Sequence, residues 1–155
     1  MQNFEKPFRF IPLNMQTVNA IFAWECSESE DGFFMTPYYD SYLTNPEEMR
    51  GPGGCHGFGV FAGDALFGLF EYKIVEDGLE IGCAISPNFR NQGFGERFVK
   101  EGIEFGISEF QYSGSRVFLS VNEGNAAARR VYHKVGFIVE QRDKRELRMS
   151  LTIVN

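Results

Sequence analysis

The sequence has few of the residues that build disulfide frameworks and metal sites. Its 155 residues include only three cysteines (Cys26, Cys55 and Cys83) and two histidines (His56 and His133). No two cysteines form a C-x-x-C pair, and their odd number argues against a set of disulfides. A zinc site would need an unusual set of ligands with so few histidines. We therefore expect reduced thiols and no bound metal, and we interpret the adjacent Cys55 and His56 as part of a glycine-rich loop rather than as a ligand pair or a nucleophile.

Long apolar segments are absent as well. No run reaches the roughly 18 apolar residues of a transmembrane helix, and residues 1–7 contain no apolar core of signal-peptide length. Basic side chains are also in deficit, because 15 Lys and Arg stand against 21 Asp and Glu, for a net charge of −6. Neutralisation of phosphates by Lys and Arg supplies most of the affinity for nucleic acids. We expect a cytoplasmic protein that binds neither nucleic acid nor membrane.

Phenylalanine and glycine, with 17 residues each, are abundant. A chain of this length buries about 68–70% of the surface that its unfolded form exposes, so we expect one domain over residues 1–155 with an aromatic core and close backbone approaches. Charge is distributed unevenly. Residues 1–50 carry three basic and eight acidic groups, residues 51–89 carry one and five, and residues 90–155 carry eleven and eight. The N-terminal half is thus suited to a cationic partner and the C-terminal half to an anionic one.

Hydrophobic periodicity predicts an α/β chain of the α+β type, with a mixed, mostly antiparallel sheet of about six to seven strands flanked by helices. Two aromatic and β-branched runs flank Gly63-Asp64, the strongest hairpin signal in the chain. Residues 25–56 show no clear period, and a short helix is expected to begin at Pro46. The expected strands are residues 8–13, 57–61, 65–75, 79–86, 116–121, 137–140 and 147–154, and the expected helices are residues 15–24, about 95–108, and a helix of about ten residues that Asn125 caps and Gly136 ends.

Two glycines, Gly102 and Gly106, lie one turn apart on the apolar side of the helix expected at about residues 95–108. Glycine in a helix interior costs about 1 kcal/mol relative to alanine. A reason to have two of them on that side is that they let the helix lie close to a sheet.

A glycine-containing turn joins the third strand of the central meander to this helix. Gly93 and Gly95 allow the backbone to approach a ligand, and the helix N-terminus adds partial positive charge, so the turn is suited to a pyrophosphate. With Arg90 it forms R-x-x-G-x-G, which alone is a weak motif, since a turn that begins a helix also needs glycines for its geometry. A Rossmann dinucleotide site is disfavoured, because Phe98 occupies the third glycine position and the turn follows an antiparallel meander.

A second motif of the form V-x-x-x-N-x-x-A-x-x-x-Y-x-x-x-G-F lies about thirty residues downstream. Together, in this order, after a three-strand meander and before two closing strands, the two segments resemble the GNAT superfamily of N-acetyltransferases. The resemblance covers roughly residues 57–155 well and residues 1–56 only in outline. The matching positions of the second motif are Val121, Asn125, Ala128, Tyr132, Gly136 and Phe137.

The resemblance implies the acyl-CoA N-acyltransferase fold, in which the fourth and fifth strands splay apart and hold the pantetheine arm of acetyl-CoA. Acetyl-CoA is then the acyl donor, and no metal is needed. Residues 91–96 would hold the pyrophosphate, and Arg129 and Arg130 are possible further contacts. The cofactor-binding residues that the resemblance implies are Ile85, Ser86, Arg90, Asn91, Gln92, Gly93, Phe94, Gly95, Glu96, Asn125, Ala128 and Tyr132.

Acetyl transfer requires a neutral amine to attack the thioester and a thiolate to leave. Backbone N–H groups at the splay are expected to meet the oxyanion, and the resemblance places Tyr132 near the sulfur as the general acid. A lysine-type amine, with a pKa of about 10.4, needs a base, whereas an α-amino group at about 8 needs little help. We name Glu80, on the strand beside the splay, as the catalytic base and Glu71, on the neighbouring strand, as a second candidate, although both positions also suit solvent-facing residues of a strand.

The acceptor is the least determined part of the prediction. An acidic cluster that includes Glu28, Glu30 and Asp31, with nearby aromatic residues, suits a cationic and partly apolar amine, although such runs are commonly solvated loops. A small amine, an aminoglycoside-like drug, a free amino acid and a protein N-terminus are all compatible. The expected substrate contacts are Trp24, Phe33, Tyr38 and Glu71.

A second class of function stays open. The chain could be a CoA-binding sensor or interaction module of the same fold, without turnover. The presence of Tyr132 and Asn125 favours the enzyme, because a binding module does not need a proton donor at the sulfur. The predicted partners are therefore a small-molecule or peptide amine, for a monomer or homodimer.

Overall fold

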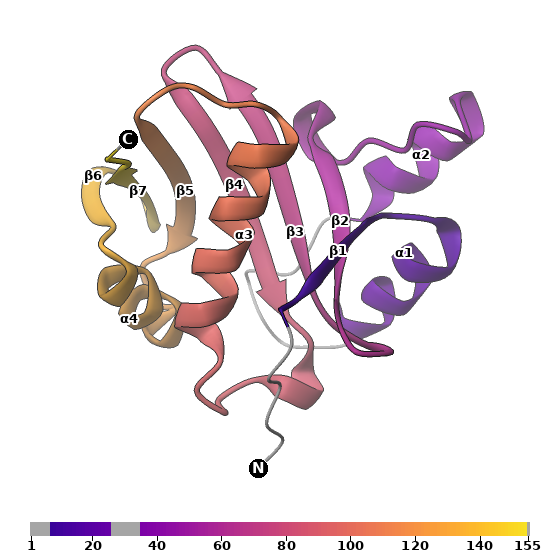
Figure 1. The fold of residues 1–155 in the computed structure, drawn as a ribbon, viewed down its shortest axis with the longest axis horizontal. Helices are drawn as coiled ribbons and strands as arrows, with labels where there is room; N and C mark the ends of the chain where they lie inside the picture. Colours follow the sequence, from indigo (N-terminus) through magenta and orange to yellow (C-terminus); the bar gives the residue numbers. More distant parts are fainter. Residues whose placement is uncertain (1–6, 26–34, 155) are drawn as a thin grey trace.

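A computed structural model describes residues 7–25 and 35–154, and its centre is a seven-stranded sheet (Figure 1). The strands follow the order β1-β2-β3-β4-β5-β7-β6, and only the β4–β5 pair is parallel. This arrangement confirms the predicted mixed, mostly antiparallel sheet. The strands are β1 (Arg9–Pro12), β2 (His56–Ala62), β3 (Ala65–Val75), β4 (Gly78–Ile85), β5 (Arg116–Asn122), β6 (Ile138–Asp143) and β7 (Glu146–Thr152).

Helices cover both faces of the sheet. The buried residues of α3 and α4 form one cluster with Phe70 and Tyr72 of β3, whereas those of α1 and α2 form another with Leu69 of the same strand. Successive strand residues point to opposite faces, so the two helix pairs lie on opposite sides. The helices are α1 (Met15–Phe22), α2 (Thr36–Thr44), α3 (Gly95–Glu109) and α4 (Ala126–Val135), with short 3-10 turns η1 (Ala23–Glu25), η2 (Pro52–Gly54) and η3 (Pro87–Phe89).

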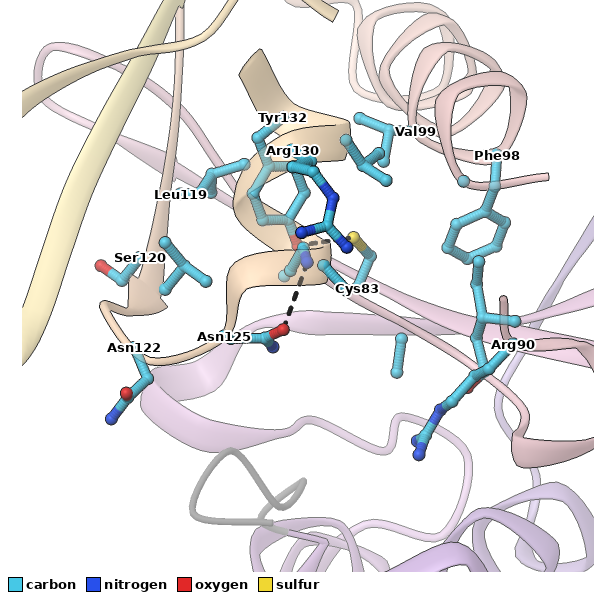
Figure 2. A pocket seen from close by; sticks show the side chains of 18 of the residues that line it. Cys83, Arg90, Phe98, Val99, Leu119, Ser120, Asn122, Asn125, Arg130 and Tyr132 are labelled. Atoms are coloured by element: carbon cyan, nitrogen blue, oxygen red, sulfur yellow. Dashed lines mark hydrogen bonds between the residues drawn. The ribbon is translucent and has the colours of Figure 1, made fainter. Parts of the chain in front are cut away.

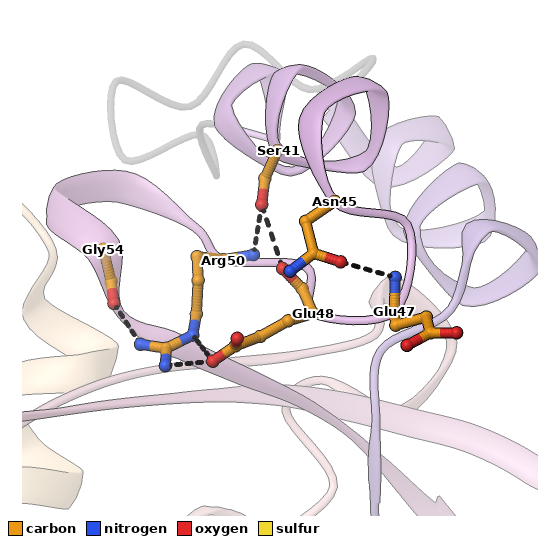
Figure 3. Close-up of polar contacts among 6 residues, drawn as sticks. All are labelled: Ser41, Asn45, Glu47, Glu48, Arg50 and Gly54. Atoms are coloured by element: carbon orange, nitrogen blue, oxygen red, sulfur yellow. Dashed lines mark hydrogen bonds and ion pairs between the residues drawn. The ribbon is translucent and has the colours of Figure 1, made fainter.

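The helix expected to begin at Pro46 was placed wrongly, because α2 ends at Thr44, before this residue. Only Tyr38 of α2 is buried, so the segment carries little hydrophobic periodicity. Pro46 follows the C-cap residue Asn45, a common position for a proline that ends a helix. Side-chain bonds then order the connection to β2: the Ser41 hydroxyl accepts from the Arg50 amide at 2.9 Å, and the Arg50 guanidinium donates to the Gly54 carbonyl at 3.1 Å (Figure 3).

The helix α3 lies unusually close to β3, as its glycines predict. The Tyr72 hydroxyl donates a hydrogen bond of 2.6 Å to the Gly102 carbonyl. A Cβ atom added to Gly102 would lie 2.1 Å from the ring of Phe70, and one added to Gly106 would lie 2.4 Å from the ring of Tyr72. The abundant phenylalanines fill the rest of this layer, where the rings of Phe70 and Phe98 lie 5.1 Å apart.

The strands β4 and β5 separate soon after they meet. Their parallel ladder consists of the pairs Leu79–Val117 and Glu80–Phe118, although β4 continues to Ile85. The predicted splay between the fourth and fifth strands is thus confirmed. Within the described residues no helix is long and apolar enough to cross a membrane. Phe33 and the acidic residues 28, 30 and 31 lie outside the described part of the chain.

Candidate active site

A cavity of about 1340 Å³ opens where β4 and β5 separate (Figure 2). Its wall includes Ile81 and Cys83, which face α3 and α4, and also Gly82 and Ala84, which face the other side of the sheet. Because consecutive residues of one strand line it, the cavity runs along the separated edge of β4, where the backbone of the strand borders it. Backbone groups of β4 that no longer pair with β5 are therefore available to a molecule in the cavity.

The turn that leads into α3 forms one end of the cavity. Gly93 lines it with a φ of 86°, a left-handed conformation that glycine adopts without strain. The N-cap residue Phe94 provides no side-chain hydrogen bond to the first turn of α3. A Cβ atom on Gly95 would lie 2.8 Å from Val131 of α4, so a glycine is needed for the two helices to meet here. The turn thus presents backbone N–H groups and a helix N-terminus to the cavity.

The hydroxyl of Tyr132 reaches the wall of the cavity from α4. It lies 3.5 Å from the Sγ atom of Cys83 on β4, and the tyrosine is 9% exposed (Figure 2). Burial raises the pKa of the Cys83 thiol to about 11, so this cysteine stays protonated at neutral pH. Asn125 begins α4 as predicted, since its Oδ1 atom accepts a hydrogen bond of 3.2 Å from the Ala128 amide.

Comparison with models of known protein families gives one match to the chain. The model of the acetyltransferase (GNAT) family matches residues 18–137. The chain belongs to this family. It is therefore an N-acetyltransferase of the GNAT type, as the two motifs predicted.

Solved structures of GNAT proteins share the fold at low sequence identity. Spermidine N-acetyltransferase from Vibrio cholerae, in complex with CoA and spermine, is 16% identical with a TM-score of 0.72 over 94% of this chain and 95% of that one. N-acetyltransferase PseH from Campylobacter jejuni is 19% identical with a TM-score of 0.70, over 95% and 99%. The ribosomal-protein-S18-alanine N-acetyltransferase from Escherichia coli is 16% identical with a TM-score of 0.69, over 94% and 93%. A search of curated proteins finds no match.

Most of the residues predicted to bind the cofactor line the cavity at the splay, and three of them lie outside its wall. Ser86 is buried and accepts a bond of 3.4 Å from the Asn88 amide. Gln92 donates a bond of 2.9 Å to the Asn88 carbonyl, and Glu96 pairs with Lys100 at 3.2 Å. The predicted residues that line the cavity are Ile85, Arg90, Asn91, Gly93, Phe94, Gly95, Asn125, Ala128 and Tyr132.

Most charged residues of the cavity wall are basic, and sequence reasoning found only some of them. Arg130 and Lys134 of α4 line the cavity, as do Lys144 and Arg145 of the turn between β6 and β7. The excess of basic residues in residues 90–155 was the signal for these side chains. The position of Lys144 and Arg145 beside the cavity depends on the tertiary structure, so the sequence alone did not reveal it. Arg90 instead turns back, with its Nε atom donating to the Ile85 carbonyl at 2.9 Å.

The predicted base and substrate contacts lie away from the cavity wall. Glu80 stands at the closed end of the splay, 42% exposed, with a carboxylate oxygen 3.4 Å from Arg148. Trp24 is partly buried against the cluster under α1 and α2, and Tyr38 is completely buried there. Glu71 is not a solvent-facing residue, because its carboxylate accepts a hydrogen bond from the Tyr38 hydroxyl. Their roles stay predictions.

Metal ligands do not gather around the site. Among residues 7–25 and 35–154, no three His, Cys, Asp or Glu side chains form a group that could hold a metal ion.

Proposed function

We propose that the protein transfers the acetyl group of acetyl-CoA to a primary amine, of a small molecule or a protein N-terminus, by direct attack of the amine on the thioester. The observation that carries this proposal is the cavity at the splay of β4 and β5 with the Tyr132 hydroxyl in its wall. In this proposal the thioester lies in the splay beside Tyr132 and the amine attacks it there, so the chain forms no covalent intermediate of its own.

The residues of the cavity fit the donor in charge and shape. The turn into α3 offers N–H groups to a pyrophosphate at a helix N-terminus. The charged residues of the wall are mostly basic, since Arg130, Lys134, Lys144 and Arg145 outnumber Asp143 and Glu146, and this balance favours the phosphates. Acetyl-CoA, when bound, supplies an activated thioester. Tyr132 then donates its hydroxyl proton to the leaving sulfur, since a thiol with a pKa of about 8.5 leaves readily with such help.

The acceptor class follows from charge. The sequence before residue 90 is rich in acidic groups, and the relatives include enzymes named for spermidine and for an alanine of a ribosomal protein. We therefore place cationic amines first among acceptors, and a peptide with a free N-terminus second.

Calorimetric titration with acetyl-CoA, with NAD as the control, tests the donor site without knowledge of the acceptor. Micromolar binding of acetyl-CoA alone is expected. Release of free thiol is then measured with spermidine, an aminoglycoside, a free amino acid and a peptide with a free N-terminus. Binding without release for every amine would favour the sensor, and no binding by the folded protein would refute the proposal.

Arg130 is expected to contribute to donor affinity, whereas its neighbour Arg129 is not. Arg130 lines the cavity, but Arg129 donates a bond of 2.9 Å to the Glu123 carbonyl outside it. An exposed charge pair contributes up to about 1 kcal/mol, so Arg130→Gln should weaken acetyl-CoA binding roughly fivefold at low salt. The difference should shrink as salt screens the pair. Equal losses for Arg129→Gln and Arg130→Gln in calorimetry would contradict this assignment.

A further inference from the structure

A carboxylate outside the cavity wall lies beside β4, on the side of the sheet that α1 and α2 cover. Glu71 of β3 lies opposite Gly82 of β4, and Gly82 lines the cavity. A Cβ atom added to Gly82 would lie 3.3 Å from the Oε1 atom of Glu71. Gly82 has no side chain, so only its backbone lies between the Glu71 carboxylate and that part of the cavity. Glu71 thus comes closer to the separated part of β4 than Glu80, which stays at the closed end beside Arg148.

Uncharged side chains hold the Glu71 carboxylate in place by hydrogen bonds. Its Oε2 atom accepts a hydrogen bond from Tyr38, and the Cys55 thiol is a further partner. Burial raises the pKa of Tyr38, and it raises the pKa of Cys55 to about 12, so both groups stay neutral donors. Within the described residues, no Lys, Arg or His forms an ion pair with Glu71. A largely buried carboxylate without a cation is costly, and an incoming ammonium group offers the missing positive charge.

We propose that Glu71 takes the proton of the incoming ammonium group, and that Tyr38 and Cys55 are positioning residues that hold its carboxylate toward Gly82. This inference rests on the proposed acetyl transfer and assigns its base. Glu71 is the catalytic residue on the acceptor side, and Tyr132 is its counterpart on the donor side. The adjacent residues Gly82 and Cys83 mark these two sides, since Glu71 lies over Gly82 and the Tyr132 hydroxyl lies 3.5 Å from Cys83.

The protons of the reaction balance in this arrangement. The Glu71 carboxylate removes one proton from the ammonium group and passes it to water. The neutral nitrogen then forms the C–N bond as the C–S bond breaks, and the sulfur takes the hydroxyl proton of Tyr132. The nitrogen gives up its second proton, which restores the Tyr132 hydroxyl through water. The net result is one amide, one thiol and one released proton.

Distant parts of the chain meet around the Glu71 carboxylate. Tyr38 lies on α2 and Cys55 precedes β2, and their hydroxyl and thiol are 3.7 Å apart. The connection between them is ordered by Ser41, Arg50 and the Gly54 carbonyl (Figure 3). Glu71 also acts on Cys83 of β4 electrostatically, which raises the pKa of that thiol further. The Tyr38 hydroxyl, the Cys55 thiol and the Glu71 carboxylate are in direct contact, whereas Cys83 faces the other side of the sheet. Lys73 and Glu80, which pair with each other across β3 and β4, lie on the same side as Glu71.

The test compares Glu71→Gln with Glu104→Gln, a matched change on the exposed side of α3. Free-thiol release is measured with spermidine, glycylglycine and hydroxylamine. General-base catalysis contributes about 10²-fold or more, so Glu71→Gln should lower kcat/KM for spermidine by about that factor. The loss should be much smaller for hydroxylamine, which is largely neutral at pH 7. Acetyl-CoA affinity and melting temperature should not fall, and Glu104→Gln should match the wild type.

The pH dependence of kcat/KM distinguishes a positioning role of Tyr38 from a role in packing alone. A base acts only when unprotonated, and burial raises the pKa of Glu71, so kcat/KM should fall as the pH drops through that raised value. The Tyr38 hydrogen bond opposes this rise, so Tyr38→Phe should move the acid limb to higher pH while the plateau at high pH persists. An unmoved limb would remove the role of Tyr38.

The experiment distinguishes failure of the base assignment from failure of the proposed function. If the wild type acetylates an amine and Glu71→Gln does so equally well, the base assignment is overturned while acetyl transfer stands; a loss confined to Glu80→Gln would have the same meaning. If the wild type binds acetyl-CoA but releases thiol with no amine, the proposed function itself fails.

Discussion

Replacing Tyr132 by phenylalanine is expected to lower kcat by about 10²-fold or more, because a general acid contributes a factor of this order. The affinity for acetyl-CoA should stay within a few-fold. The ring is retained in this change, and with it the contact with Phe137, whose centroid lies 5.9 Å away. Only the hydroxyl is removed, and it lies 3.5 Å from Cys83 at the wall of the cavity. Thiol release gives kcat, and calorimetry gives the affinity.

Tyr112→Phe is the matched control for this change. Its hydroxyl donates a bond of 2.9 Å to the Arg116 carbonyl, far from the wall of the main cavity. Removing that bond should cost about 1 kcal/mol of stability and leave kcat unchanged. A large loss of acetyl-CoA affinity with unchanged turnover in Tyr132→Phe would remove the acid role from this residue.

Much of the cavity wall was predictable from the sequence because it is built from local segments. The turn with Gly93 and Gly95 is continuous with β4 and α3, and Asn125 and Tyr132 share one helix. Spacing along a helix and glycines at a turn are visible without the tertiary structure. The two motifs placed the helices, and the family resemblance that they carry implied the splay. Nine of the twelve predicted cofactor residues line the cavity that results.

The proposed acceptor side depends on contacts between distant residues, and from the sequence alone we placed Glu80 before Glu71. Tyr38 and Glu71 are 33 positions apart, and α2 has too little periodicity to be placed. One signal was available: with a turn after Val75, the pairing of Val75 with Gly78 puts Glu71 opposite Gly82. That register shows a glycine facing a glutamate. It does not show where β4 and β5 separate, and this point decides between Glu71 and Glu80.

The close approach of α3 to β3 predicts that Gly102→Ala destabilises the protein by about 2 kcal/mol. An alanine in a helix is favoured by about 1 kcal/mol over glycine, so in an isolated helix the change would stabilise. Here the new methyl group would lie 2.1 Å from two atoms of the Phe70 ring. This ring is completely buried and stacks on Tyr72 at 5.3 Å, so it has little room to turn. Overpacking of this kind costs about 3 kcal/mol, and it outweighs the gain in propensity.

Thermal and urea unfolding measure this balance, with Ser108→Ala on the exposed side of the same helix as the control. In a chain of this size, about 2 kcal/mol lowers the melting temperature by roughly 4–8 °C, and the urea midpoint should fall with an unchanged slope. Ser108→Ala gains helix propensity without meeting a neighbour, so its midpoint should not fall. A higher midpoint for Gly102→Ala would mean that α3 can move off β3. The hydrogen bond from Tyr72 to the Gly102 carbonyl would then not fix their distance, and the position of the turn that begins α3 at the cavity would need another explanation.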